Sequence, residues 1–507
     1  MRTNFSALIF DLGGVLLNWS PQSITAVSPG QLKLLMHSET WHDLDKGKIT
    51  LDEACELFGD MLGVDSLAVK TSLDQAQKSL KVNQRLVRIA KELKESDGDL
   101  QIYIMSNISK EHFEIVRRMD LPWPIITSAF ASGHEGMRKP DLCFFNHVLG
   151  QINAHPSQVV MVDDEPDNIC AARSLGIHGI LHERTSGDIG KTLRNLFQDP
   201  VSRAEAYMKN GAGNHHCVME GYDAPLMDNF AQLLIWELTG DADLVYIRFP
   251  SGKLHAPHTT NSSAGTTVEA PAAQSNVANG LWNYFYDKPV QTTRDFPPDA
   301  DTTSTAYLCL PSHHLDSVAD VNLVMNAMAA NTNADGIMQT YFCADRPRTS
   351  PEVCCNILRV FCRFGCGDDP RIRATRDWVV RCLHNRAYVH GSRFYSTPET
   401  FLYFSARLYL ECSSETLKEE LEVVKEALLE RVNVPVNPLA LALRIFACQL
   451  VGIDARFWRQ DLAAFQALQE EDGGWPAGHF CCMGRTGAKI GNRGLTTALA
   501  LRIMERR

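Results

Sequence analysis

Two sets of polar residues in this 507-residue sequence have the residue types and the spacing of catalytic sites. In the first set, Asp11, Ser106 and the pair Asp163-Asp164 each follow a short apolar run, and Lys139 stands in a loop before the last run. Phosphoryl transfer needs a carboxylate nucleophile, a hydroxyl and a lysine to hold phosphate oxygens, and further carboxylates for Mg²⁺. The first set therefore predicts a phosphoryl-transfer site.

The second set is the sequence Asp299-Ala-Asp301-Thr302-Thr303. Protonation of an unactivated alkene needs a far stronger acid than a solvated carboxyl group, which ionises with a pKa of about 3.9. Burial beside a second carboxylate keeps one of the two protonated, and neighbouring hydroxyls hold the geometry. The pattern fits such an acid, and it equally fits an N-cap at Asp299 that starts a helix running through Tyr307.

The elements that must position the first set are parallel strands. Short apolar runs at residues 7–10, 102–105 and 159–162 end at polar clusters, as strands of an α/β sheet do where ligands bind at their carboxyl ends. Residues 21–94 have helical spacing and predict an inserted cap, whose limits we place at about 17 and 100. The first domain is expected to span residues 1–197.

The second set lies in a region of different character. Turn-forming residues over 198–216 predict a linker, and repeated helical segments over 217–507 predict a separate all-α domain. Residues 255–280 are rich in Thr, Ser, Asn, Ala and Pro, which predicts a long loop that is either disordered or a lid. A chain of this length holds two or three domains.

Composition narrows the class of protein. The formal net charge of −11 argues against a nucleic-acid partner, which needs a basic face. No segment approaches the roughly 20 apolar residues of a membrane span, and the N-terminus lacks a secretory signal, so we expect a cytoplasmic protein. The 15 cysteines lack zinc-site spacing and are expected to be reduced thiols.

The first set, in its order and context, resembles the haloacid dehalogenase (HAD)-like hydrolases that carry a helical cap. The resemblance implies Mg²⁺ as cofactor, and it makes Asp11 the nucleophile and a metal ligand. The other metal ligands that it implies are the backbone carbonyl of Gly13, Asp163 and Asp164. The phosphate-binding residues that it implies are Ser106, Asn107 and Lys139.

One position departs from the HAD-like pattern. The family usually has a second Asp two residues after the nucleophile, as general acid for the leaving group, and Gly13 stands there instead. A departing alkoxide needs a proton, whereas a departing phosphate monoester, with a second pKa of about 6, is a tolerable anion near neutral pH. The sequence therefore favours cleavage of a diphosphate over that of a simple phosphate ester.

The segment from Asp163 to Asp167 also matches the Asp-Asp-x-x-Asp motif of ionisation-type terpene synthases. Those enzymes need the motif on a helix, whereas here a β-branched apolar run precedes it and Pro166 interrupts it. We interpret the segment as the metal-binding loop of the hydrolase.

The second set resembles the catalytic motif of protonation-initiated (class II) terpene cyclases. By that resemblance Asp301 donates the proton, and Asp299 and Thr302 support it. The segment from Gln469 to Trp475 resembles the Gln-Trp repeat of triterpene cyclases, which implies an α/α barrel. Aromatic faces are expected to line the cation cavity, and the candidates are Trp282, Tyr284, Phe285, Tyr286, Tyr341, Phe342, Phe401, Tyr403, Phe404 and Trp475. The candidate diphosphate-binding cations are Arg393, Arg485, Lys489 and Arg493.

The combination resembles the fused drimane-type sesquiterpene synthases of microbes. It implies that farnesyl diphosphate, a small-molecule prenyl diphosphate, is cyclised to a bicyclic diphosphate and then dephosphorylated towards an alcohol. One alternative is a cyclase that releases a bicyclic mono- or diphosphate, with a HAD-like domain that is only partly active. In another alternative, that domain is a scaffold. The oligomeric state is left open by the sequence.

Overall fold

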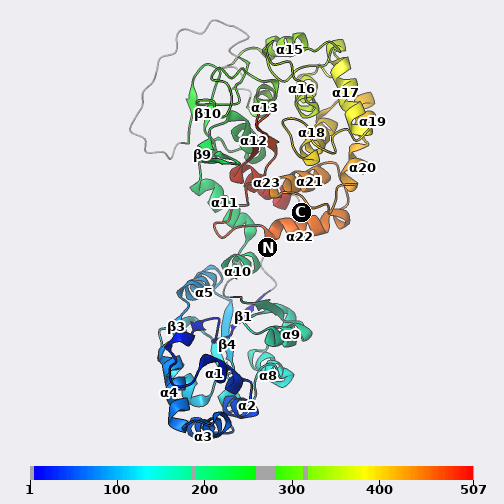
Figure 1. Cartoon of the computed structure of the whole chain (residues 1–507). Coiled ribbons are helices and arrows are strands. Elements are labelled where there is room, and N and C mark those ends of the chain that lie inside the picture. The colour runs from blue at the N-terminus through cyan, green and yellow to red at the C-terminus, as the bar shows by residue number, and fades with distance from the viewer. Residues whose placement is uncertain (1–4, 184–188, 258–279, 312–313, 315–317, 506–507) are drawn as a thin grey trace. The chain divides into compact units, whose positions relative to one another are not determined.

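The structure is a computed structural model that describes residues 5–183, 189–257, 280–311, 314 and 318–505 (Figure 1). Most of the loop expected over 255–280 lies outside these residues. The chain divides into two compact units, Met1–Asp199 and Pro200–Arg507, which we describe one at a time.

The first unit is built around a five-stranded parallel sheet in the order β5-β4-β1-β6-β7. Phe10 of β1 is in register with Ile104 of β4 and Val162 of β6, so these strands end close together and the residues that follow them meet at one edge. The strands are β1 (Ala7–Phe10), β4 (Gln101–Ser106), β5 (Ser128–Ala131), β6 (Val159–Asp163) and β7 (His178–Leu181).

Both faces of this sheet are covered, as its continuous apolar strands require. Because side chains alternate along a strand, Leu8 and Phe10 enter one buried cluster while Ala7 and Ile9 enter another. The helices of this layer are α5 (Gln84–Ser96), α6 (Lys110–Val116), α7 (Ser132–Glu135), α8 (Leu142–Ile152), α9 (Pro166–Ser174) and α10 (Ile189–Phe197).

A helical cap is inserted between β1 and β4 and has its own apolar core. It consists of α1 (Pro29–Met36), α2 (Glu39–Asp45), α3 (Leu51–Leu62) and α4 (Ser66–Lys78). The short strands β2 (Leu17–Asn18) and β3 (Lys81–Val82) pair where the chain enters and leaves the cap. Helix α5, inside the range expected for the cap, instead packs its apolar face on the sheet.

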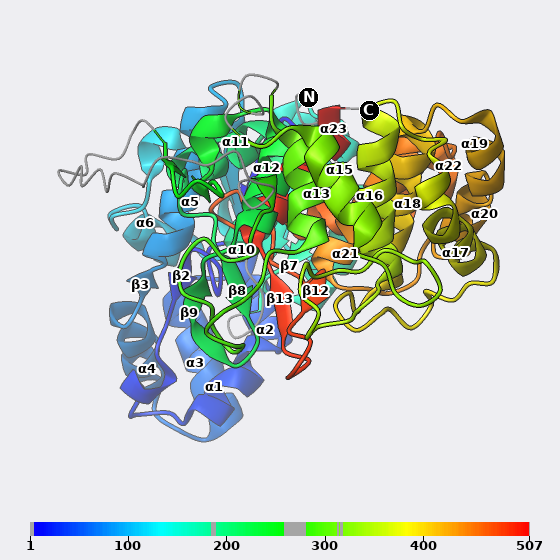
Figure 2. The same ribbon diagram turned by 90° about the horizontal axis from the view of Figure 1, so that it is seen from above.

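The second unit is a closed ring of helices in the residues that the structure covers (Figures 1 and 2). Each ring helix packs on the next, and the last packs on the first. In ring order they are α12 (Asn229–Thr239), α13 (Ala300–Cys309), α16 (Pro351–Arg363), α18 (Pro398–Glu411), α21 (Pro438–Leu450) and α23 (Arg493–Glu505). The predicted α/α barrel is thus present.

A second set of helices packs against individual members of the ring. They are α11 (Pro200–Asn210), α15 (Val321–Ala330), α17 (Arg373–His384), α19 (Glu415–Leu421), α20 (Val424–Leu429) and α22 (Ala455–Ala467). Helix α11 packs on α23 and begins at Pro200, where the sequence suggested a linker.

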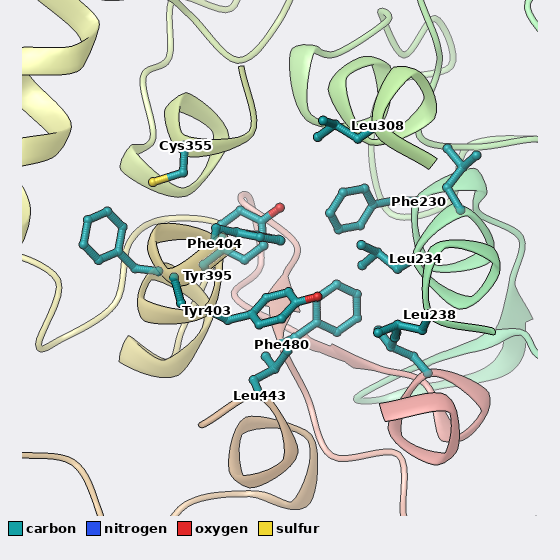
Figure 3. Packing of buried hydrophobic residues seen from close by; sticks show 14 of the residues in the cluster. Phe230, Leu234, Leu238, Leu308, Cys355, Tyr395, Tyr403, Phe404, Leu443 and Phe480 are labelled. Atoms are coloured by element: carbon teal, nitrogen blue, oxygen red, sulfur yellow. The ribbon is translucent and has the colours of Figure 1, made fainter. Parts of the chain in front are cut away.

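Apolar side chains from the ring helices point into a shared interior (Figure 3). Phe230, Leu234 and Leu238 come from α12, and Phe404 of α18 and Leu443 of α21 meet them there. This packing fills the part of the ring where these side chains meet.

Short strands complete the second unit. An antiparallel sheet has the order β12-β13-β8-β9, and β10 pairs with β11. The strands are β8 (Cys217–Met219), β9 (Tyr222–Leu226), β10 (Ile247–Arg248), β11 (Leu254–His255), β12 (Cys481–Cys482) and β13 (Lys489–Gly491). Within the described ranges, every helix is too short or too polar to cross a bilayer.

Candidate active sites

The carboxyl edge of the parallel sheet brings together the acids of the first set. One oxygen of each of Asp11, Asp163 and Asp164 lies within 4.8 Å of the others, which is a spacing that a single metal ion can bridge. Lys139, almost fully buried, places its Nζ 3.0 Å from Asp11 Oδ1 and 2.6 Å from Asp163 Oδ2. The four residues predicted separately from the sequence therefore form one cluster.

Burial sets the protonation of this cluster. It raises the pKa of Asp11 to about 6, against the opposing charge of Lys139 and a hydrogen bond from Ser106. Burial alone would lower the pKa of Lys139, but the charges of Asp11 and Asp163 outweigh it and leave that pKa raised. The lysine consequently stays cationic, as a phosphate-holding group must.

Both oxygens of the Asp163 carboxylate accept hydrogen bonds or face a cation. Oδ2 faces the Lys139 ammonium, and Oδ1 accepts hydrogen bonds from Glu165 N at 2.9 Å and Asn168 Nδ2 at 3.0 Å. Asp163 therefore orients the lysine, and one of its oxygens also lies within 4.8 Å of oxygens of Asp11 and Asp164, the two carboxylates that we expect to bind the metal.

Asp164 lies directly against Gly14. A Cβ at residue 14 would stand 1.7 Å from Asp164 Oδ2, and the φ of +73° also favours glycine. This cradle fits the acidic side chain of a metal site, and we conclude that the donor set suits a hard divalent cation.

Asn107 contacts the lysine backbone. Its Oδ1 accepts from Lys139 N at 2.7 Å, and its Nδ2 donates to Lys139 O at 2.8 Å. The contacts that the structure shows for this side chain thus fix the lysine loop, which differs from the direct phosphate contact that the sequence suggested.

Gly13 is exposed, and a Cβ built there meets no heavy atom of the described residues within 4 Å. Its φ lies outside the left-handed range. Space and backbone both permit a side chain, so the missing family acid is not a steric requirement of the loop.

In the second unit Asp299 is the N-cap of α13. Its Oδ1 accepts from Thr302 N at 2.7 Å and its Oδ2 from Thr302 Oγ1 at 3.0 Å. The N-cap interpretation of the sequence is thus confirmed for Asp299. A catalytic role remains compatible with it, because Asp299 and Thr302 line the same cavity as Asp301.

Asp301, in the first turn of α13, has a separate set of partners. Asn356 Nδ2 donates to its Oδ1 at 2.8 Å, and the Tyr395 hydroxyl donates to its Oδ2. Arg359 Nη1 donates to Asn356 Oδ1 at 2.9 Å, which turns the amide donor towards Asp301. Sequence reasoning missed Asn356 and Tyr395, which have no motif and lie 55 and 94 residues from Asp301.

Both acids hold protons more tightly than solvated carboxyl groups. Burial raises the pKa of Asp299 to about 7, with the charge of Asp301 adding to the rise. Burial likewise raises the pKa of Asp301 to about 6, against the hydrogen bonds of Tyr395 and Asn356. Near neutral pH the pair therefore retains a proton.

The acids face a cavity of about 330 Å³. Its aromatic lining residues are Phe230, Tyr284, Phe285, Phe296, Tyr341, Phe394 and Tyr395. Of the aromatic residues predicted from the sequence, Tyr284, Phe285 and Tyr341 are among them, whereas Trp282, Phe401 and Trp475 are packed in the core. Aromatic faces stabilise cations without reacting with them.

Arginine side chains also line the cavity. Arg393 and Arg485 were predicted, and Arg346 and Arg348 were not. Arg346 lies over the Phe296 ring, 4.9 Å from its centroid. Guanidinium groups pair well with phosphate oxygens, so this set suits an anionic ligand.

The other two predicted cations are placed differently. Lys489 is exposed on β13 and is not among the residues lining the cavity. Arg493 is paired with Asp472 at 2.8 Å and lies over the Tyr207 ring, 4.9 Å from its centroid. Arg493 therefore helps to hold the segment of the Gln-Trp repeat.

The two named residues of that repeat join helices. Trp475 stacks on Phe465 of α22 and donates its Nε1 hydrogen to the Phe465 carbonyl at 2.8 Å. Gln469 Nε2 donates to Pro200 O at the start of α11, at 2.9 Å. The motif thus fastens α11 and α22 together.

The first unit therefore has the fold and charge cluster of a carboxylate-dependent phosphohydrolase, and the second has a buried acid facing an aromatic cavity. The model of the "Sesquiterpene cyclase astC-like C-terminal domain" family matches residues 201–364. The sequence is 37% identical over 498 residues to "Drimenol cyclase drtB" of Aspergillus calidoustus, over 98% of this chain and 87% of that protein. The chain belongs to the family of this drimenol cyclase.

Two further comparisons each cover 36% of the chain. "Sesquiterpene phosphatase astK" of Aspergillus oryzae is 37% identical over 180 residues, which are 36% of this chain and 91% of that protein. A solved HAD family enzyme from Bacteroides thetaiotaomicron, in complex with magnesium and inorganic phosphate, is 20% identical. It covers 36% of this chain and 96% of its own, with a TM-score of 0.31.

Proposed function

We propose that the chain is a bifunctional sesquiterpene synthase, which cyclises farnesyl diphosphate by protonation and then removes phosphate to give a drimane-type alcohol. The observation that carries this proposal is the cavity of the second unit. Asp301 faces it, aromatic rings line it, and arginines suited to a diphosphate share its wall. The names of the drimenol cyclase and sesquiterpene phosphatase relatives support the same assignment.

Cyclisation begins with the proton of Asp301. Burial raises the pKa of Asp301 to about 6 and so increases the share of the protonated acid, and the hydrogen bonds from Asn356 and Tyr395 stabilise the carboxylate that remains after the alkene takes the proton. The cation that forms is attacked by the next alkene, two rings close, and loss of a proton gives a neutral product. One proton is gained and one is lost, so the reaction is an isomerisation. The carbon–oxygen bond to the diphosphate is not broken.

Asp299 and Thr302 support the acid. The carboxyl group of Asp299 holds the first turn of α13 in place through Thr302. The charge of Asp301 raises the pKa of Asp299, so ionisation of both carboxyl groups together is disfavoured. Arg346, Arg348, Arg393 and Arg485 are the candidates for holding the diphosphate.

Phosphate removal belongs to the first unit. Asp11 attacks phosphorus, the phosphate oxygens are held by Lys139 and Ser106, and water then releases phosphate from Asp11. Mg²⁺ is the expected cofactor, held by Asp11, Asp164 and the backbone carbonyl of Gly13. When bound, it would neutralise charge on the phosphoryl group.

The second candidate function is release of a bicyclic mono- or diphosphate. The glycine at position 13 favours the monophosphate. Without an acid at that position, the phosphate anhydride is expected to be cut faster than the phosphate ester. A bicyclic monophosphate should then appear before the alcohol.

The test is to incubate the whole chain with farnesyl diphosphate and Mg²⁺ and to follow products by mass spectrometry. We expect a bicyclic alcohol and free phosphate. The Asp301→Asn variant should form no rings, yet should still release phosphate from a small linear diphosphate, because the two sites lie in different units. Ring formation by that variant would refute the assignment of the acid.

A further inference from the structure

Cleavage of a phosphate ester leaves an alkoxide, and some group must protonate it. Position 13 offers no acid, but the cap places another carboxyl group at the edge of the site. Asp45, at the end of α2, has a side chain that is 7% exposed. The nucleophile, the metal ligands and the phosphate-binding residues described above do not include Asp45.

Asp45 is joined to the loop that carries the site lysine. Its Oδ2 lies 3.5 Å from Nη2 of Arg138, the residue directly before Lys139. The Lys139 ammonium is in turn 3.0 Å from Asp11 Oδ1. The charges of Lys139 and Asp11 both act on the carboxyl group of Asp45, which therefore lies within electrostatic reach of the nucleophile.

The backbone of Asp45 is anchored to a second loop of the site. Ser132 Oγ donates to the Asp45 carbonyl at 2.7 Å and accepts from Ile108 N at 2.8 Å. Ile108 lies two residues after Ser106. The hydroxyl of Ser132 thus connects the cap to the loop that follows β4.

The residues after Asp45 dock on the core. A Cβ at Gly47, whose φ is +65°, would stand 2.4 Å from the Gly133 carbonyl oxygen, so the two backbones approach as closely as glycine allows. Lys46 Nζ pairs with Asp141 Oδ2 at 3.2 Å. The end of α2 is consequently fixed at the edge where β4, β1 and β6 end.

Burial and the neighbouring charges leave a fraction of the Asp45 carboxyl groups protonated near neutral pH. Burial is the largest influence and raises its pKa to about 6, while Arg138 and Lys139 lower it and Asp11 raises it. Asp11 cannot supply this proton because it forms the bond to phosphorus, and both oxygens of Asp163 already accept hydrogen bonds. Asp45 is the remaining buried carboxyl group of this edge among the described residues.

We infer that Asp45 of the cap is the general acid and base of the phosphatase, replacing the acid absent at Gly13. The inference rests on the proposed function. As Asp11 bonds to phosphorus and the ester P–O bond breaks, the Asp45 proton passes to the leaving oxygen and gives the alcohol. The Asp45 carboxylate then takes a proton from water, whose oxygen bonds to phosphorus as the bond to Asp11 breaks. Asp11 is regenerated as a carboxylate, and the proton of water restores Asp45.

The test compares two monophosphates that differ in their need for a proton. A saturated alkyl monophosphate must leave as an alcohol, whereas p-nitrophenyl phosphate leaves as a stabilised anion. With the whole chain and Mg²⁺, Asp45→Asn should slow phosphate release from the alkyl ester by about 10²-fold or more, and from p-nitrophenyl phosphate by less than about tenfold. An equal loss on both substrates would overturn the inference, because a merely structural role affects both alike.

Three further variants sharpen the experiment. Asp43→Asn, at an exposed residue paired with Lys48, is the matched control and should leave both rates unchanged. Asp11→Asn should abolish both rates, and if it does not, the proposed phosphatase is wrong whatever Asp45 does. Adding Gly13→Asp to Asp45→Asn should restore part of the alkyl-ester rate, since position 13 has room for a side chain. Absence of any recovery would count against a missing proton as the cause of the loss.

Discussion

The carboxyl groups of Asp299 and Asp301 depend on exclusion of water for their acidity. Burial raises their pKa values to about 7 and about 6, and the reaction uses the protonated form. A proton is present below these values and is lost as pH rises through them. The rate of ring formation should therefore fall as pH increases from about 6 to about 8. Initial rates of bicyclic product across that range measure it, and a rate that rises with pH would contradict the assigned acid.

Arg346 illustrates a second residue-scale effect, because its guanidinium lies over Phe296 while sharing the cavity with other arginines. A hydrogen bond to a charged group contributes about 1.5–3 kcal/mol, so Arg346→Met should lower kcat/KM for farnesyl diphosphate by about 10- to 100-fold. Arg371→Met is the control, because Arg371 is exposed and pairs with Asp369 away from the cavity. Equal effects of the two substitutions would exclude a specific role for Arg346.

At the scale of elements, Trp475 shows how a short motif holds the barrel together. Its ring is fully buried, stacks on Phe465 and donates a hydrogen bond to the Phe465 carbonyl. Trp475→Ala should cost about 3–5 kcal/mol of stability in the second unit. The shift of the unfolding midpoint is measured by a urea titration in which cyclisation activity is the readout. The control is Phe457→Ala, at a 45% exposed position of α22, which should move the midpoint little. If the Trp475 variant unfolds at the same midpoint as this control, the motif does not stabilise the barrel.

Elements also explain which features could be predicted from the sequence. The strands that lead to Asp11 and Asp163 are short apolar runs, and parallel strands align their ends, so the first site follows from local patterns. The cap boundary at α5 was less predictable, since this helix has helical periodicity whether it packs on the cap or on the sheet. Periodicity gives the buried face of a helix but not its partner.

The partners of Asp301 mark the limit of such reasoning. Asn356 lies on α16 and Tyr395 precedes α18, and only the packing of α13, α16 and α18 side by side brings them to Asp301. The same holds for Asp45, whose place beside the phosphatase site depends on how the cap docks. Contacts between distant segments have no signature in a single sequence, whereas motifs confined to one strand end or one helix start do.

At the scale of the whole molecule, the two reactions are divided between units with separate apolar cores. The apolar core of the ring is built from its own side chains, and the sheet of the first unit is covered by its own helices. A substitution in one site should therefore leave the other site folded. The order of reactions follows from the chemistry, because cyclisation consumes alkenes and retains the carbon–oxygen bond to the diphosphate.

This division predicts the product of a chain that lacks the phosphatase nucleophile. Asp11→Asn replaces a buried carboxylate by an amide of similar size, so the Lys139 loop should persist while attack on phosphorus stops. With farnesyl diphosphate and Mg²⁺, the variant should accumulate a bicyclic diphosphate at the wild-type rate of ring formation, as time-resolved mass spectrometry would show. The wild type should pass through a bicyclic monophosphate, because the anhydride is the easier bond to cut.

Mixing Asp11→Asn with Asp301→Asn protein should restore the alcohol after a lag, since each chain retains one intact site and the diphosphate can pass between them. Free alcohol from Asp11→Asn alone at the wild-type rate would mean that phosphate leaves by another route, and the division of labour between the units would be wrong.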